Sequence, residues 1–258
     1  MKNYKLLVDT AALAGEIMLS SGAETYRVED TMYHILKTSD IGTIEALALL
    51  TGIVVTVNDE SMEQPLTVMK TVNDRVTNMS TIIKVNDISR RYCAGKITLE
   101  QAYEQLNHVR GKVFNRVLYN LGTVGIAIGF AMMFGGRGQE LIVTAIVGAL
   151  LATIITLGKI AKWSGIFVNA FGGMGIAMLA MFFKSFIFHN MDADIVIVAA
   201  IMPIVPGVAI TNAIRDTLQG DYLSGCGRML EAFLTAASIA VGIGLGMVMV
   251  NGLFGGVL

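Results

Sequence analysis

The stretch that decides the fold reads IVIVAAIMPIVPGVAI, from Ile195 to Ile210. It is apolar throughout and, with its flanking residues, long enough to cross a bilayer. Pro203 and Pro206 each remove a backbone hydrogen bond from a helix, and lipid offers the freed carbonyls no other donor. We therefore expect a broken helix whose free backbone groups meet protein or a water-filled cavity. Discontinuous helices of this kind are where transporters hold their solutes.

The composition of the whole chain favours a membrane protein. Of its 258 residues 54% are hydrophobic and only 15% are charged, which is too apolar for one soluble domain of this size. The apolar excess follows residue 113. The net charge of −1 gives no indication of nucleic-acid binding. Its histidines and its two distant cysteines show no ligand spacing, so we expect no metal site and no cofactor.

Residues 1–110 have the pattern of a small α+β domain, which we expect to be cytoplasmic. Two helical segments come first, and the second is predicted to start with a capping box of Ser21 and Glu24. A second capping box, Thr98 with Gln101, opens the last helix. Between these helices the sequence predicts three strands, at 43–50, 52–57 and 66–72, and a helix at about 78–94.

Residues 113–258 predict an all-α polytopic membrane bundle of five transmembrane helices. Five apolar stretches reach the length of a bilayer core, at 113–134, 141–158, 165–188, 195–213 and 229–254. Lysine and arginine gather before the first stretch and in the loops after the second and the fourth. The positive-inside rule then places the N-terminus in the cytoplasm and the C-terminus outside.

Polar side chains in or beside these stretches are few, and they are the candidates for solute binding. A helix that begins after Pro206 would aim free N–H groups at a carboxylate, and unpaired carbonyls before Pro203 could receive an ammonium group. Proton coupling needs an ionisable group, for which Glu231 and Asp216 are the candidates. The alternative is a structural kink beside an ordinary interfacial ion pair. The predicted substrate-binding set is Pro203, Pro206, Gly207, Thr211, Asn212, Arg215 and Asn120.

A second charged group lies in the run GAETYRVEDT, from Gly22 to Thr31. Glu24, Arg27 and Glu29 are its candidate functional residues, because they gather two carboxylates around one guanidinium at a helix start. Acids at a helix start usually just complement the helix dipole. The chain contains no nucleophile elbow, phosphate loop or nucleotide fingerprint. We therefore predict no catalytic residue and no enzyme activity.

The run GAETYRVEDT, the later MPIVPG at 202–207 and the pair Gly220-Asp221 together resemble the threonine/serine exporter family of bacterial membrane proteins. The resemblance spans nearly the whole chain. It implies a secondary exporter of threonine and serine, or of small dicarboxylates such as succinate, driven by the proton motive force in the inner membrane. Family members either fuse two membrane halves or divide them between a longer and a shorter subunit. This chain resembles the longer one, which implies a smaller membrane partner subunit or a homo-oligomer.

Two other functions stay open at this point. A membrane-anchored hydrolase would use Glu24, Arg27, Glu29 and His34, although the sequence supplies no nucleophile or metal cluster for it. A regulatory or scaffold subunit would leave the pore to its partner. The choice among threonine, serine and dicarboxylates also stays open.

Overall fold

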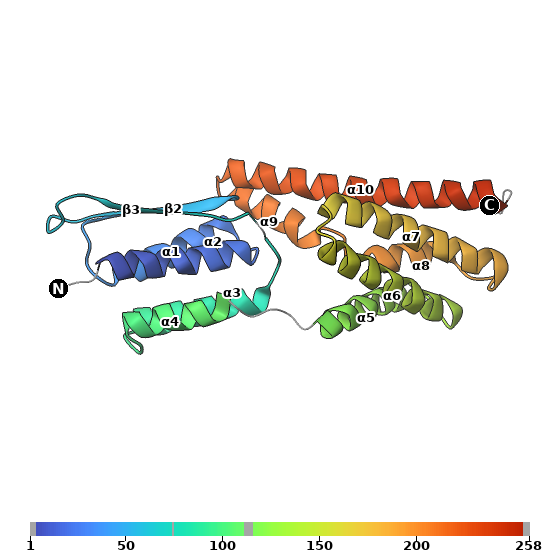
Figure 1. The fold of residues 1–258 in the computed structure, drawn as a ribbon, viewed down its shortest axis with the longest axis horizontal. Coiled ribbons are helices and arrows are strands. Elements are labelled where there is room, and N and C mark those ends of the chain that lie inside the picture. Colours follow the sequence, from blue (N-terminus) through green and yellow to red (C-terminus); the bar gives the residue numbers. More distant parts are fainter. Residues whose placement is uncertain (1–3, 74, 111–115, 255–258) are drawn as a thin grey trace. The chain divides into compact units, whose positions relative to one another are not determined.

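The computed structural model describes residues 4–73, 75–110 and 116–254 (Figure 1). The chain divides into two compact units. The first unit comprises Met1–Val113 with Val208–Met229, and the second comprises Phe114–Gly207 with Leu230–Leu258. The chain therefore leaves the second unit directly after Gly207, at the end of the predicted break. The division into a cytoplasmic and a membrane domain near residue 110 stays a prediction.

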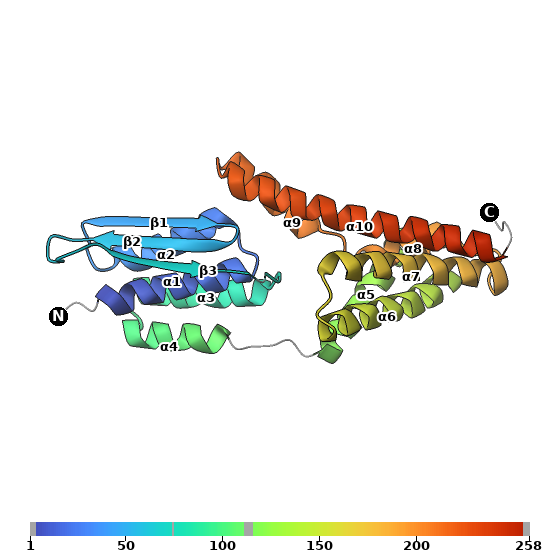
Figure 2. The ribbon, with the colours of Figure 1, turned by 45° about the horizontal axis from the view of Figure 1, so that its top comes forward.

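The N-terminal part of the first unit has three layers, a sheet, a pair of helices and a second pair, which Figure 1 shows with the sheet on edge; Figure 2 shows the three strands of the sheet apart. The three-stranded sheet is antiparallel, in the order β1-β2-β3. Its strands are β1 (Thr43–Leu49), β2 (Gly52–Asn58) and β3 (Leu66–Thr71). The helices are α1 (Tyr4–Ser20), α2 (Thr25–Lys37), α3 (Met79–Cys93), α4 (Leu99–Arg110), α9 (Gly207–Leu218) and the start of α10 (Tyr222–Phe254).

The core of the first unit lies between the sheet and the α1–α2 pair. Alternate residues of β2, Ile53, Val55 and Val57, are buried, as period-two alternation predicts for a sheet with one covered face. Met18 of α1 and Met32 of α2 are fully buried in the same core. Helix α1 is buried on most of its surface because it contacts the sheet, α2, α3 and α4.

The two predicted capping boxes have different outcomes. The box of Thr98 and Gln101 is confirmed, with the Thr98 N–H donating to Gln101 Oε1 at 3.0 Å and the Gln101 N–H donating to Thr98 Oγ1 at 3.3 Å. The box of Ser21 and Glu24 is wrong. Helix α2 begins one residue after Glu24, whose side chain makes no capping hydrogen bond. That carboxylate binds arginines instead.

The second unit is a helical bundle of α5 (Arg116–Met133), α6 (Gln139–Ile160), α7 (Gly165–Phe186), α8 (Ala193–Ile201) and the remainder of α10. Val147, Leu151, Ile176 and Val196 are fully buried at its centre. Helices α7 and α10 approach closely because α10 carries glycines at the contact. A Cβ at Gly242 would lie 2.1 Å from the carbonyl oxygen of Ala170.

Four helices of the described chain, α5, α6, α7 and α10, are long and apolar enough to cross a membrane. The fourth predicted transmembrane helix, at 195–213, is not one continuous helix. Helix α8 ends at Ile201, residues 202–206 form turns, and α9 begins at Gly207. The nine residues of α8 span about 13 Å, less than half of a hydrocarbon core. The predicted break is therefore confirmed, and a bundle of five complete spans is not.

Candidate functional site

The first unit buries a group of charged side chains where the loop before α2 meets α9 and the start of α10. We call this group the charge cluster; its members are Glu24, Arg215, Asp216 and Arg228. Glu24, Asp216 and Arg228 are 7%, 1% and 5% exposed. Charges so deeply removed from water are retained only when they are paired.

Glu24 is shared between two arginines. One carboxylate oxygen accepts a hydrogen bond from Arg215 of α9, and the other lies 3.5 Å from Nε of Arg27, one turn along α2. The Arg215 side chain is half exposed, so it reaches inward from the surface to a buried carboxylate. The Glu24 side chain is thereby drawn away from the helix end that it was expected to cap.

Asp216 and Arg228 form a buried ion pair with additional partners. Oδ2 of Asp216 lies 2.9 Å from Nε of Arg228. Oδ1 of Asp216 accepts the backbone N–H of Thr25 at 3.3 Å, in the first turn of α2, and Nη2 of Arg228 donates to the carbonyl of Ala23 at 2.7 Å. Each charge thus also holds the backbone of the loop before α2, and Asn212 adds a hydrogen bond to the carbonyl of Gly22 at 3.1 Å.

The helical hairpin of α9 and α10 places these residues. Gly220 has φ +91, a left-handed conformation that ends α9, and Asp221 follows it as a cap, accepting the Ser224 N–H at 3.1 Å. The two helices then approach closely because Gly225 has no side chain. A Cβ there would lie 2.2 Å from Oγ1 of Thr217. The pair Gly220-Asp221 therefore forms the turn that sets Asp216 opposite Arg228.

Glu29, in the run from Gly22 to Thr31 that also contains Glu24, connects α2 to the sheet. Its Oε1 accepts the backbone N–H of Ala48 in β1 at 2.8 Å. Partial burial raises the pKa of the Glu29 carboxyl, and the negative charges of Asp221 and Asp216 raise it further, against the opposing effect of the Ala48 hydrogen bond. The carboxylates of the motif thus lie in one electrostatic neighbourhood with those of the α9–α10 hairpin.

At the break, some backbone carbonyl groups accept hydrogen bonds from nearby N–H groups, and others do not. The carbonyl of Ala199, which Pro203 leaves without its helical partner, accepts the Met202 N–H at 3.3 Å, and the Ile201 carbonyl accepts two N–H groups of the turn. Within the described backbone no N–H reaches the carbonyl of Met202, the acceptor that Pro206 leaves without a donor. The carbonyl of Met202 therefore remains as an acceptor at the break.

The predicted site residues separate into two groups. In the first unit the structure brings Asn212, Arg215 and Asp216 of α9 together with the motif of Glu24 and Arg27, a contact that no sequence pattern predicts. Thr211 lies exposed on α9. The second unit holds Pro203, Pro206 and Gly207 at the break, Asn120, which accepts a hydrogen bond from Thr156 at 3.1 Å, and Glu231, which is exposed on α10. Their roles in binding and proton coupling stay predictions.

Sequence reasoning missed Arg228 as a functional residue, because it counted that side chain only as a loop charge. The signal that could have found it is the spacing. Asp216 and Arg228 carry opposite charges on either side of the Gly220-Asp221 turn, and an antiparallel helical hairpin brings such positions face to face.

The residues of the predicted hydrolase site are engaged with one another or with other partners. Nδ1 of His34 lies 2.8 Å from the carbonyl oxygen of Asp30 and 3.2 Å from its carboxylate. Glu24 binds two arginines. A carboxylate held by guanidinium groups is a poor general base, so this geometry does not favour the hydrolase hypothesis.

Comparison with known proteins gives consistent results. The model of a family described as "Putative threonine/serine exporter" matches residues 9–250. A probable threonine/serine exporter of Mycobacterium tuberculosis is 25% identical over 241 residues, covering 92% of this chain and 45% of the relative. A threonine/serine exporter of Corynebacterium glutamicum is 24% identical over 255 residues, covering 93% and 50%. The chain thus spans about half the length of these relatives. No solved structure matches it significantly.

Proposed function

The chain belongs to the threonine/serine exporter family, and on this premise we propose that it is a subunit of a secondary transporter that exports threonine and serine. The family and the four long apolar helices make it a protein integral to a membrane. The observation that carries the proposal is the interruption at residues 202–206. A helix broken within an apolar region keeps polar backbone groups where a solute can use them.

The chemistry of the break suits a small zwitterion. The carbonyl of Met202 would accept from the ammonium group of the solute. The N–H of Gly207, where α9 begins, already donates to the carbonyl of Val205 at 2.9 Å, so the N–H groups that follow it in the first turn would donate to the carboxylate of the solute. Pro203 and Pro206 keep both sets of groups out of helical pairing. The hydroxyl of Thr211, one turn into α9, would contact the hydroxyl of the solute.

Asn212 and Arg215 act differently in this proposal. Both already bind protein groups of the first unit, so we assign them the task of holding α9 rather than touching the solute. Asn120 stays a candidate for lining the path in the second unit. Glu231 stays the candidate for proton coupling, because Asp216 is already paired with Arg228.

The proposal extends to the membrane and to a partner. The distribution of lysine and arginine supports a cytoplasmic N-terminus, in the bacterial inner membrane. Because the sequence resembles the longer subunit of the divided members of this family, we propose that a smaller membrane subunit, or a second copy, completes the transporter. Small dicarboxylates are the alternative substrates.

The test is reconstitution of the full chain in vesicles, alone and with its co-purifying subunit, followed by efflux of labelled threonine and succinate under an imposed proton gradient. Pro203→Ala with Pro206→Ala should reduce threonine efflux strongly while insertion and yield stay unchanged. Val198→Ala, at an exposed position of α8 before the break, is the matched control and should retain efflux. Undiminished flux from a well-inserted double alanine variant contradicts the proposed site.

A regulatory or scaffold role is the second candidate, and the half-length of the chain favours it. In that case the partner subunit alone would export threonine at the full rate. Efflux that requires both chains excludes this candidate.

A further inference from the structure

A polar cavity of about 450 Å³ lies between α2 and α3 of the first unit, beside the charge cluster. We call it the α2–α3 cavity. It is of a size that holds small ligands. The lining residues that matter here are Arg27, Asp30 and Thr31 of α2 and Asn86, Arg90 and Cys93 of α3.

Some hydrogen-bonding groups of this cavity already have protein partners: His34, which also lines it, lies with Nδ1 3.2 Å from Oδ1 of Asp30, and the Cys93 thiol donates to the carbonyl of His34 at 3.5 Å. Other groups of the cavity have no such partner. Among the described residues, the guanidinium of Arg90 has no ion-pair partner, and the side chains of Asn86 and Thr31 make no hydrogen bond. Thr31 is nevertheless only 7% exposed. Within the part of the chain that the structure describes, the ionic contact of Arg27 is its 3.5 Å approach to Glu24. The cavity thus combines two guanidiniums, one carboxylate from Asp30, and neutral donors and acceptors.

We propose that the α2–α3 cavity binds a free α-amino acid as an effector of the transporter. The carboxylate of the ligand pairs with Arg90 and Arg27, a guanidinium arrangement suited to planar anions. Its ammonium group pairs with Asp30, and Thr31 and Asn86 satisfy a polar side chain. The choice of threonine as the ligand rests on the proposed function. The cavity and its charges are features of the structure and are independent of that proposal.

Arg27 connects this cavity to α9. Its guanidinium lies between the cavity and Glu24, and the other oxygen of Glu24 binds Arg215. A ligand carboxylate therefore competes with Glu24 for Arg27 and changes the electrostatics of the Glu24–Arg215 contact. Because coupling between two sites is reciprocal, a change in α9 would also alter the affinity of the cavity.

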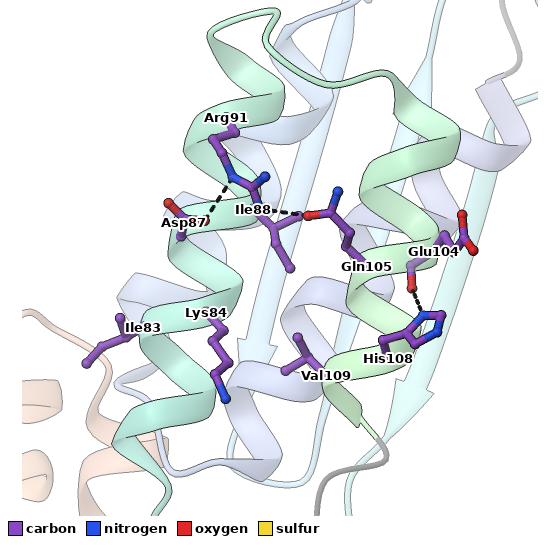
Figure 3. Close-up of a pocket in the computed structure, with 9 residues that line it drawn as sticks. All are labelled: Ile83, Lys84, Asp87, Ile88, Arg91, Glu104, Gln105, His108 and Val109. Atoms are coloured by element: carbon purple, nitrogen blue, oxygen red, sulfur yellow. Dashed lines mark hydrogen bonds and ion pairs between the residues drawn. The ribbon is translucent and has the colours of Figure 1, made fainter.

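A larger cavity of about 710 Å³ between α3 and α4 differs in this respect (Figure 3). Ile88 and Val109 make part of it apolar, and its arginine is already paired. Arg91 lies 2.8 Å from Asp87 and donates to Gln105 at 2.7 Å, as the dashed lines in Figure 3 show. Arg91 therefore serves as a matched control for Arg90, its neighbour in sequence.

Cys93 allows a direct test, because its thiol lines the cavity, and Cys226 on α10 is an exposed internal control. The full chain in detergent is alkylated with a maleimide at constant pH, and the rate at each cysteine is followed by mass spectrometry. Threonine at ten times its Kd should slow alkylation of Cys93 by about tenfold, by mass action, and leave Cys226 unchanged. Succinate lacks the ammonium group and ethanolamine lacks the carboxylate, so both should protect much less.

In the Arg90→Gln variant, threonine should no longer slow alkylation of Cys93. The alkylation rate of Cys93 without ligand should match that of the wild type, which shows that the cavity is intact. Arg91→Gln should retain the protection. The inference is overturned if saturating threonine leaves Cys93 unprotected, if both cysteines are slowed equally, or if Arg90→Gln stays fully protected. Protection without efflux would count against the proposed function alone, and efflux without protection against the effector site alone.

Discussion

Asp216 and Arg228 show how a buried ion pair can fix a local structure. Both charges have lost most of their water. Besides pairing with each other, Arg228 donates to the carbonyl of Ala23 in the loop before α2, and Asp216 accepts the N–H of Thr25, the first residue of α2. Such a pair adds little stability compared with apolar side chains of the same shape, but removal of one partner leaves an uncompensated charge. The contribution of this pair is therefore one of geometry, in holding residues 22–25 against the α9–α10 hairpin.

We expect Asp216→Ala to lower the free energy of unfolding by about 3–5 kcal/mol, because it removes the carboxylate that pairs with the buried Arg228. Denaturant unfolding of the full chain in detergent, monitored by far-UV circular dichroism, measures this decrease in the free energy of unfolding. Asp87→Asn breaks an exposed pair with Arg91 and should cost about 0.3–0.5 kcal/mol. The combined Asp216→Leu, Arg228→Met variant should be less damaged than either single variant. Additive losses would contradict this view of the pair.

Glu29 predicts a pH dependence of stability. Its pKa in the folded chain is raised above the ordinary value of 4.5, chiefly by burial. The folded state therefore favours the protonated carboxyl, and this stabilisation is complete below pH 4.5 and is lost as pH rises through the raised pKa. Glu29→Gln can still accept from Ala48 and should remove this loss. Melting temperatures measured across the acidic range should show that the stability of the variant relative to the wild type increases as pH rises. A difference in melting temperature that does not change with pH would contradict the assignment.

At the scale of elements, periodicity and turn residues predicted most of the first unit. The strands at 43–50, 52–57 and 66–72 appear as β1, β2 and β3 within a residue at each end, and the break at 202–206 appears where the prolines predicted it. These features depend on neighbours in sequence. The membership of α9 in the first unit could not be predicted, because its partners near Gly22 lie 190 residues away. The failed Ser21–Glu24 cap has the same cause.

The packing of α7 against α10 can be tested by two glycine-to-alanine substitutions on α10, one at the contact and one away from it. Gly242→Ala should destabilise the second unit, because the new Cβ would collide with the backbone of Ala170. Gly244→Ala has no atom within 4 Å of the new methyl group and should be neutral, or stabilising by up to about 1 kcal/mol through helix propensity. Thermal unfolding in detergent compares the two variants. Equal effects would show that α7 and α10 are not in close contact.

At the scale of the whole molecule, the shared length with known exporters sets the expectation for assembly. The chain aligns with 45% and 50% of two relatives, and the proposed partner subunit or second copy would supply the counterpart of the remainder. We expect the protein extracted in mild detergent to have a mass above that of one 27.6 kDa chain, by multi-angle light scattering with the detergent subtracted. A monomer that exports threonine alone would contradict the need for a partner.

The first unit is assembled from two separate segments of the chain, and this affects the order in which it can fold during synthesis. Its N-terminal portion leaves the ribosome early, but α9 and Arg228 emerge only after the helices of the second unit have been translated. At bacterial elongation rates that interval is on the order of ten seconds. During it, the Glu24 carboxylate and the loop before α2 lack the arginines that later cover them. The unit is therefore completed only after α5 to α8 have been translated, and nascent chains truncated before α9 would expose this surface to chaperones and proteases.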